Sequence, residues 1–127
     1  MNNTENRIRL RKINVIIIEE VSMVSPYLLD YINQMFCELH NSALPFGGIM
    51  VLIIGDLAQL PPINAQFVFK SASWESFMPL FLSIPKRHSD DLEFFQILQQ
   101  IRFNQITEQT WKKLEEKVNI FLILIHH

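Results

Sequence analysis

INVIIIEEVSM, residues Ile13 to Met23, is the stretch that decides the fold of this chain. Its β-branched residues, Val15 to Ile18, end in two acids, Glu19 and Glu20, so an apolar strand delivers two carboxylates to its carboxyl end. Open α/β sheets bind their ligands just beyond the carboxyl ends of their strands. The stretch therefore predicts a buried strand whose end contributes to a ligand site.

A second apolar run has the same form and follows a predicted helix. Ser25, followed by proline, starts this helix, because a hydroxyl caps free amides and proline suits the first helical position. Apolar residues then recur every three or four positions to about His40. Ile49 to Ile54 is continuously apolar, as in a strand buried on both faces, and Asp56 follows it closely. Two such strands joined by a helix predict an α/β fold with a parallel sheet.

The second half of the chain predicts one more strand and two helices. Leu80 to Ile84 is a third apolar stretch and is expected to form a third strand. Ser89 to Asp91 starts a helix that should end near Phe103, and Thr107 caps another helix. The apolar tail, residues 121–127, is interpreted as the start of a further strand or the end of a truncated reading frame.

Composition and charge limit the classes of function. A chain of 127 residues that is 49% hydrophobic and 19% charged is typical of one globular unit. Its net charge of -2 gives no general basic field, so any contact with nucleic acid would need a local patch. Cys37 is the only cysteine, which fits a structural thiol in a reducing compartment. Without a signal-peptide core or an apolar run of roughly 18 residues, the sequence predicts a soluble, intracellular protein.

The acid pair and two later polar residues each allow two interpretations. Nucleotide-hydrolysing motors place two such acids opposite the phosphates, where one carboxylate holds hydrated Mg²⁺ and the other activates the attacking water. Taken alone, Glu19 and Glu20 are more often two solvated acids at a strand end. Taken alone, Gln59 is more often a loop amide that satisfies local backbone, and Arg87 is more often a surface cation near Asp90 or Asp91.

Several segments resemble the central part of the Pif-one-like DNA helicases, superfamily-one motors that act 5′ to 3′. The order and spacing of these segments match that family from about Asn14 to Val118, and GDLAQLPP is the most specific piece. The matching segments are VIIIEEVSMVSPYLLDYINQMF, PFGGIMVLIIGDLAQLPPI, FVFKSASW and RHSDDLEFFQILQQIR. The resemblance implies a parallel-sheet, RecA-like P-loop NTPase core.

The resemblance also implies a role for each candidate site residue. Glu19 and Glu20 occupy the family's acid pair, which makes Glu19 the Mg²⁺ ligand and Glu20 the catalytic carboxylate. Gln59 occupies the position of the glutamine that contacts the terminal phosphate of ATP, and Arg87 that of the arginine that reaches the same phosphate. Gln59 and Arg87 are therefore expected both to bind ATP and to take part in catalysis. Asp56 is expected to orient this loop or to stabilise its turn.

The chain departs from the family pattern in two ways. The family has Asp-Glu where this chain has Glu19 and Glu20, and the phosphate loop G-x-x-x-x-G-K-[ST] expected before the pair is absent. We therefore expect an incomplete motor that lacks the phosphate-loop half. In this interpretation residues 1–84 are the second half of the first RecA-like domain, residues 85–118 a helical segment toward the second motor domain, and residues 119–127 a truncated tail.

Two functional hypotheses follow from the resemblance. The first is a fragment of an ATP-dependent DNA helicase, from a family that unwinds DNA in repair, recombination and telomere maintenance. Its substrate would be ATP, its cofactor Mg²⁺ and its partners single-stranded and duplex DNA, in the nucleus or alternatively the mitochondrion. The isolated chain is then predicted not to hydrolyse ATP. The second hypothesis is a degenerate, noncatalytic module that binds protein or DNA; an unrelated α/β ligand-binding domain would require the motif matches to be accidental.

Overall fold

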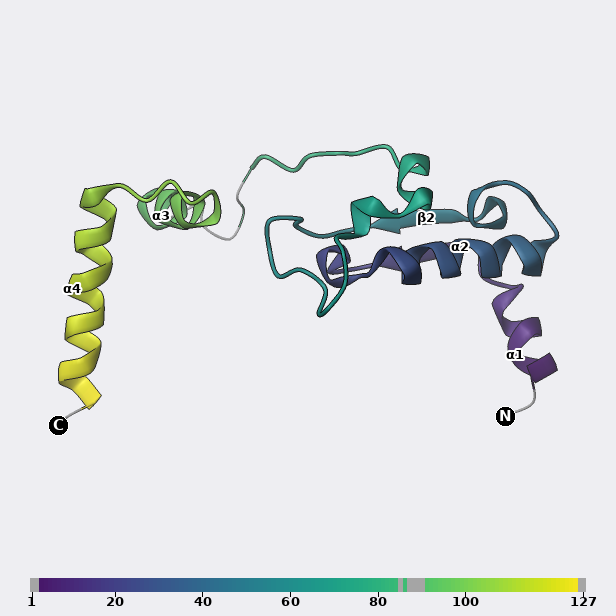
Figure 1. Ribbon diagram of the computed structural model, residues 1–127, viewed down its shortest axis with the longest axis horizontal. Coiled ribbons are helices and arrows are strands. Elements are labelled where there is room, and N and C mark those ends of the chain that lie inside the picture. Colours follow the sequence, from purple (N-terminus) through teal and green to yellow (C-terminus); the bar gives the residue numbers. More distant parts are fainter. Residues whose placement is uncertain (1–2, 85, 87–90, 126–127) are drawn as a thin grey trace. The chain divides into compact units, whose positions relative to one another are not determined.

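The structure is a computed structural model that describes residues 3–84, 86 and 91–125, with side chains of residues 4–84, 86 and 91–118 (Figure 1). It divides into two compact units, Met1–Leu80 and Phe81–His127, each of which is described by itself. The first unit contains α1 (Asn3–Leu10), β1 (Val15–Ile18), η1 (Val21–Met23), α2 (Pro26–His40), η2 (Pro45–Gly48), β2 (Met50–Ile53), η3 (Val68–Lys70) and η4 (Ala72–Ser76). The second contains α3 (Leu92–Arg102) and α4 (Glu108–Ile125).

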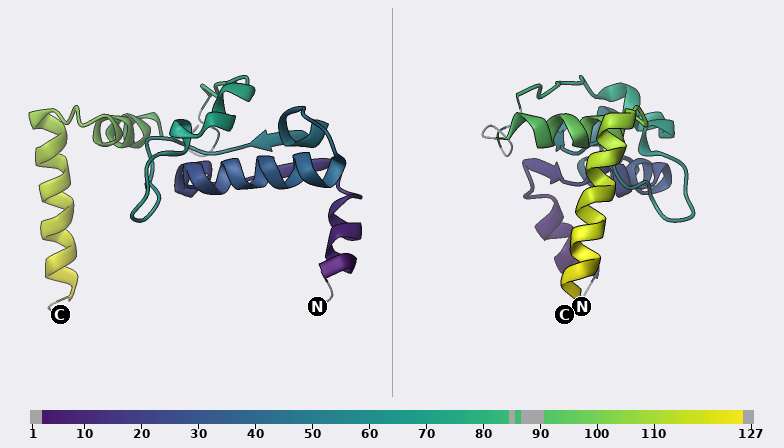
Figure 2. Two further views of the ribbon diagram at one scale, coloured as in Figure 1. Left: turned by 45° about the vertical axis from the view of Figure 1, so that its right-hand side comes forward. Right: turned by 90° about the vertical axis from the view of Figure 1, so that its left-hand side faces the viewer.

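The predicted parallel sheet is present and contains β1 and β2. The strands pair in parallel from Val15 opposite Met50 to Ile18 opposite Ile53. Helix α2 connects them and runs alongside the strands in the views of Figures 1 and 2. This strand, helix, strand arrangement confirms the predicted α/β fold.

Helix α2 begins and ends where its sequence predicts. The Oγ atom of Ser25 accepts a hydrogen bond from the backbone N–H of Leu28 at 3.2 Å, and proline occupies the first helical position. At the other end Asn41 adopts a left-handed conformation, with φ 48° and ψ 48°, and its N–H donates to the carbonyl oxygens of Cys37 and Glu38. The helix buries the face that carries Leu29, Phe36 and Leu39.

The hydrophobic core lies between α2 and one face of the sheet. Its fully buried residues are Val21, Leu29, Phe46 and Val68. Partly buried apolar side chains pack against them from the sheet, from α2, from the residue after η1, and from η4 and the residue after it; they are Ile18, Val51, Ile53, Ile32, Val24, Trp74 and Phe77. The sheet side chains in this set alternate along β1 and β2, as the pleat of a strand requires.

The prediction that the strands are buried on both faces is wrong. Val15 and Ile17 of β1 are 49% and 60% exposed, and Met50 and Leu52 of β2 are 69% and 48% exposed. These four side chains share the face of the sheet that points away from the core cluster, because side chains alternate between the faces of a strand. Within the described residues, the continuous apolar pattern therefore corresponds to one covered face and one uncovered face.

The PFGG segment forms a tight turn that brings the chain from α2 into β2. Phe46 is 2% exposed although its φ is 53°, and its N–H donates to Oδ1 of Asn33 at 2.6 Å. Gly47 has a φ of 69°, and a Cβ atom there would lie 2.4 Å from the carbonyl oxygen of Phe36. The turn therefore needs glycine, both for its left-handed backbone and for its contact with α2.

The second unit confirms the predicted helix starts at Asp91 and Thr107, whereas Ser89 and Asp90 lie outside the described residues. Oδ1 of Asp91 accepts from the N–H of Phe94 at 2.9 Å at the start of α3, and Oγ1 of Thr107 accepts from the N–H of Thr110 at 3.2 Å before α4. Lys113 of α4 and Glu93 of α3 form an ion pair. In the part of the chain that the structure describes, no helix is both long enough and apolar enough to cross a lipid bilayer.

Two strand predictions in this region are wrong. Residues 80–84 form no strand, and Leu80, Phe81 and Leu82 are 84%, 89% and 97% exposed. A strand requires a hydrogen-bonded neighbour, and the two described strands pair only with each other. The apolar tail continues α4 to Ile125 instead of starting a strand, because no turn residue separates it from the helix and leucine and isoleucine are compatible with helical backbone.

Candidate active site at the carboxyl edge of the sheet

Three predicted site residues follow the carboxyl ends of the two strands. Glu19 and Glu20 come directly after β1, and Gln59 lies in the loop that follows β2. Because the strands are parallel and in register to their last residues, both loops leave the same edge of the sheet. All three side chains are exposed, which leaves them accessible to a ligand. Arg87 and its neighbour His88 lie outside the described residues.

The backbone of Ile54 makes two hydrogen bonds, one to the residue before the acid pair and one to the residue after it. The N–H of Ile54 donates to the carbonyl oxygen of Ile18 at 2.8 Å, and the carbonyl oxygen of Ile54 accepts from the N–H of Val21 at 3.1 Å. Glu19 and Glu20 are the two residues between those contacts. The backbone that carries both carboxylates is therefore fixed at each end by the residue that precedes the second loop.

Glu20 has a left-handed backbone, with φ 51° and ψ 45°. A non-glycine residue in this region costs roughly 1–2 kcal/mol, and such strain persists only where the surrounding contacts enforce it. The contacts of Val21 supply that constraint, since its N–H is bonded to Ile54 and its side chain is 3% exposed in the core. Strain at a charged loop residue is a feature of functional sites.

Gly55 allows the two loops to approach each other, a role that we did not predict from the sequence. A Cβ atom at Gly55 would lie 2.7 Å from the backbone nitrogen of Val21 and 3.0 Å from its Cγ1 atom. Any larger residue would push the acid-pair loop away from the second loop. A glycine directly after a buried strand is the sequence feature that could have indicated such a close contact.

Asp56 organises the loop that contains Gln59. Its carbonyl oxygen accepts from the N–H of Gln59 at 2.9 Å, and its Oδ1 accepts from the N–H of Ala58 at 3.0 Å. Its Oδ2 accepts from Nε2 of the Gln59 side chain at 3.3 Å. Asp56 therefore stabilises the turn, as one of its two predicted roles requires, and it also contacts the predicted phosphate-binding side chain.

A second carboxylate, Asp30 of α2, supports the site from the core side and was also not predicted. Its Oδ1 accepts from Oγ of Ser71 at 2.6 Å, from the N–H of Ser73 at 2.9 Å and from Oγ of Ser73 at 2.7 Å. Partial burial raises the pKa of Asp30, but these hydrogen bonds and one from the Ala72 backbone outweigh that effect and leave the pKa below its ordinary value. The contacts hold η3 and η4 on α2, where Val68 of η3 packs in the same core cluster as Val21.

The donor atoms at the edge fit a hydrated magnesium ion. Mg²⁺ in nucleotide sites is held by one or two carboxylates, with water and phosphate oxygens completing the shell, and Glu19 and Glu20 offer two adjacent carboxylates. Among the described residues there is no group of three or more His, Cys, Asp or Glu side chains able to hold a metal without such help. The site therefore fits an ion that arrives with nucleotide better than an ion caged by protein.

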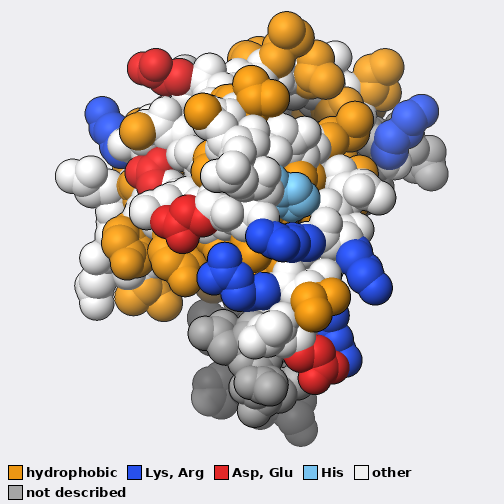
Figure 3. All heavy atoms as spheres, turned by 90° about the vertical axis from the view of Figure 1, so that its right-hand side faces the viewer, with side chains coloured by type: hydrophobic (Ala, Val, Ile, Leu, Met, Phe, Trp, Pro, Cys, Tyr) orange, Lys and Arg blue, Asp and Glu red, His pale blue; other side chains and the backbone are white. Residues whose placement is uncertain are grey.

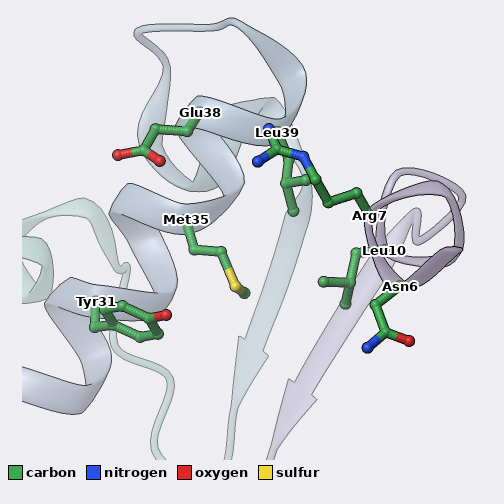
Figure 4. Close-up of a pocket in the computed structure, with 7 residues that line it drawn as sticks. All are labelled: Asn6, Arg7, Leu10, Tyr31, Met35, Glu38 and Leu39. Atoms are coloured by element: carbon green, nitrogen blue, oxygen red, sulfur yellow. The ribbon is translucent and has the colours of Figure 1, made fainter. Parts of the chain in front are cut away.

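A shallow pocket of about 220 Å³ lies elsewhere, between α1 and α2 (Figure 4). Its lining residues are Asn6, Arg7 and Leu10 of α1, and Tyr31, Met35, Glu38 and Leu39 of α2. Helix α1 precedes the amino end of β1, so this pocket is not formed by the loops that carry the candidate site. Figure 3 shows Lys and Arg side chains among apolar surface on the face of the molecule at the right of Figure 1.

The family comparison covers most of the chain. A family model described as "PIF1-like helicase" matches residues 1–116. The ATP-dependent DNA helicase Pif1 of Bdellovibrio bacteriovorus is 35% identical over 116 residues, which cover 87% of this chain and 26% of that protein. The human ATP-dependent DNA helicase PIF1 is 32% identical over 107 residues, which cover 79% of this chain and 16% of that protein. The chain thus spans about a quarter of the bacterial relative's length and less of the human one.

Solved structures agree with the family comparison. The Pif1 helicase of Candida albicans matches with a TM-score of 0.81 and 32% identity, over 87% of this chain and 26% of that one. A Bacteroides Pif1 helicase in complex with ADP-AlF3 and ssDNA matches with a TM-score of 0.80 and 30% identity, over 91% of this chain and 30% of that one. The predicted family resemblance and fold class are therefore both confirmed.

Proposed function

This chain is a member of the PIF1-like helicase family, and from that premise we propose that it supplies the acid-pair and glutamine loops of an ATP-dependent DNA helicase. One observation carries the proposal. The two loops that would face the nucleotide are fastened to each other through Ile54 at the carboxyl edge of a parallel sheet. That edge is where α/β proteins bind their ligands.

Each site residue then has a separate task in ATP hydrolysis. Glu20 orients or deprotonates the attacking water, and the left-handed backbone at this position sets where its side chain leaves the loop. Glu19 is the residue that would hold the hydrated Mg²⁺ that accompanies ATP, and the ion would neutralise phosphate charge when bound. Gln59 lies beside the terminal phosphate, and Arg87 is assigned to the same phosphate from the family resemblance alone.

The finer functional assignments rest on the family. We propose that the complete motor moves 5′ to 3′ on single-stranded DNA and serves repair, recombination and telomere maintenance in the nucleus. We further propose that the 127-residue chain by itself does not turn over ATP, because no phosphate loop with its lysine occurs in the sequence. Magnesium-dependent ATP hydrolysis by the purified chain would contradict this.

A chimeric helicase tests the proposed site directly. Residues 1–116 would replace the matching segment of the Bdellovibrio helicase, and ATPase activity stimulated by single-stranded DNA would be measured. An active chimera should lose about 100-fold or more in kcat on Glu20→Gln, because general acid–base groups contribute about 10²–10⁴-fold. Glu38→Gln is the matched control, since Glu38 lies on α2 away from the loops and contacts Gln34. Equal effects of the two substitutions would exclude Glu20 from the reaction.

A noncatalytic module is the second candidate function, and one observation favours it. Glu19 stands where the family has aspartate, so its longer side chain moves the carboxylate by about one bond length, and small misplacements at a catalytic site are costly. In the chimera, Glu19→Asp should raise kcat if the acid pair works in catalysis. An inactive chimera that folds and gains nothing from Glu19→Asp would favour the noncatalytic function.

A further inference from the structure

Asp56 holds Gln59 through both its backbone and its side chain. The backbone N–H of Gln59 is bonded to the carbonyl oxygen of Asp56 at 2.9 Å, and its Nε2 is 3.3 Å from Oδ2 of the same residue. The other carboxylate oxygen, Oδ1, is occupied by the N–H of Ala58 at 3.0 Å. Each oxygen of the carboxylate therefore has its own donor.

This contact determines which end of the Gln59 amide faces Asp56. A carboxylate oxygen without a hydrogen can only accept, whereas a glutamine side chain has one accepting end, Oε1, and one donating end, Nε2. Turning the amide over would place Oε1 against Oδ2 with no hydrogen between the two oxygens. Asp56 therefore selects the donating end, and within the described residues Oε1 of Gln59 accepts no hydrogen bond.

We propose that Asp56 is a positioning residue that leaves Oε1 of Gln59 free to accept a hydrogen from the water that attacks the terminal phosphate. The inference rests on the proposed function, because it assigns the chemistry of Gln59 at the same site. A fully ionised phosphate oxygen has no hydrogen to give to Oε1, whereas water has two. The second N–H of Nε2 is still able to donate to the phosphate, so one amide contacts both the nucleophile and its target.

Asp56→Asn separates this positioning role from the turn. The N–H of Ala58 still needs an acceptor, so the new side chain keeps its oxygen there and places its nitrogen where Oδ2 was. That nitrogen faces Nε2 of Gln59, donor against donor, and the Gln59 amide must turn over to present Oε1. The substitution thus keeps the turn and reverses the amide.

Nuclear magnetic resonance on the full 127-residue chain, labelled with ¹³C and ¹⁵N, provides the test. In the natural chain, nuclear Overhauser effects should join the Nε2 hydrogens of Gln59 to the backbone amide hydrogen of Ala58, since both donors converge on one carboxylate. In the D56N chain these effects should weaken severalfold while the Ala58 amide stays hydrogen-bonded. Asp91→Asn is the matched control, because Asp91 caps Phe94 in the second unit, and it should leave the Gln59 signals unchanged.

Two results would overturn the inference. If Asp56 only stabilises the turn, the nuclear Overhauser effects at Gln59 should be the same in the natural and D56N chains, because the turn is kept in both. Absence of the effects in the natural chain overturns it regardless of the variants. The chimeric helicase tests the proposed function separately, because its ATPase activity depends on the nucleotide site, whereas the Overhauser effects, measured on the 127-residue chain without nucleotide, decide the role of Asp56.

Discussion

The backbone N–H of Val21 donates to the carbonyl oxygen of Ile54 at 3.1 Å, across the edge of the sheet where both strands end. Val21 follows the acid pair, and Ile54 precedes the loop that contains Gln59. This contact makes the position of each loop depend on the other. Substitutions at the contact should therefore affect both loops.

Gly55→Ala tests how closely the loops must approach. The new Cβ atom would lie 2.7 Å from the backbone nitrogen of Val21, so the acid-pair loop has to move. We expect unfolding free energy to fall by about 1–3 kcal/mol, the usual cost of overpacking. Urea denaturation followed by circular dichroism measures this, and Ala65→Gly in the exposed part of the same loop is the control. An unchanged midpoint for G55A would show that the close contact is not required.

Glu20→Gly tests whether the acid pair stores backbone strain. Glycine adopts a left-handed backbone freely, so this substitution should stabilise the chain by about 1 kcal/mol while removing the carboxylate. Glu19→Gly is the matched control, because Glu19 is not among the described residues with positive φ and glycine there should cost about 0.5–1 kcal/mol. The two changes in unfolding free energy should have opposite signs. Equal signs would contradict strain at Glu20.

The Asp30 contacts with Ser71 should be strongly coupled. A double-mutant cycle on Asp30→Ala and Ser71→Ala should give a coupling energy of about 1–3 kcal/mol, because the buried Ser71 hydroxyl loses its charged acceptor when Asp30 is removed. Thermal or urea unfolding of the four chains gives this value. Gln34 and Glu38 form an exposed pair on the same helix, and their cycle should give about 0.5 kcal/mol or less. A coupling energy of about 0.5 kcal/mol or less between Asp30 and Ser71 would contradict the conclusion that Asp30 holds η3 and η4 on α2.

Asp30 should also make stability depend on acid. Its pKa lies below the ordinary value of 3.8 in the folded chain, so its contribution is complete above that value and is lost as the pH falls through the lower folded value. Unfolding free energy measured from pH 7 downward should therefore fall more in the natural chain than in the Asp30→Asn chain. Parallel curves would show that the hydrogen bonds do not favour the ionised form.

Gly47→Ala and Gly48→Ala form a matched pair in the PFGG turn. Both glycines have positive φ, at 69° and 83°, so alanine is strained at each. Only at Gly47 would the Cβ atom overlap the Phe36 carbonyl oxygen, at 2.4 Å, whereas the nearest atom at Gly48 is 3.5 Å away. We expect G47A to lower unfolding free energy by at least about 1 kcal/mol more than G48A. Equal losses would mean that backbone strain alone sets the requirement for glycine.

Local features of this chain were predictable from its sequence. Ser25 before proline, Asp91 and Thr107 each cap the helix that the sequence places after them, because a cap depends only on a hydroxyl or carboxylate a few residues from the amide it accepts. The parallel pairing of two apolar strands through α2 was predictable for a similar reason, since the apolar pattern and the helix between the strands fix the connection.

The remaining features depend on contacts between distant residues. Asp30 meets Ser71 and Ser73 across more than forty positions, and no local pattern marks those partners. The left-handed backbone of Glu20 follows from the contact of Val21 with Ile54. Residue propensities describe single positions and do not contain such a contact. The prediction of a third strand was wrong for the same reason. Residues 80–84 have the apolar composition of a strand, but in the described part of the chain no neighbouring strand pairs with them.

The sheet also has a consequence for the order of folding. Every hydrogen bond between β1 and β2 joins residues separated by α2 and the PFGG turn, so its formation requires closing a long loop. The contact of Asn33 with Phe46 is closer in sequence and can form before the strands meet. Substitutions at Asn33 should therefore slow folding, whereas substitutions at Ile53 should mainly accelerate unfolding. The two loops proposed to hold ATP are then the last part of this unit to acquire their shape.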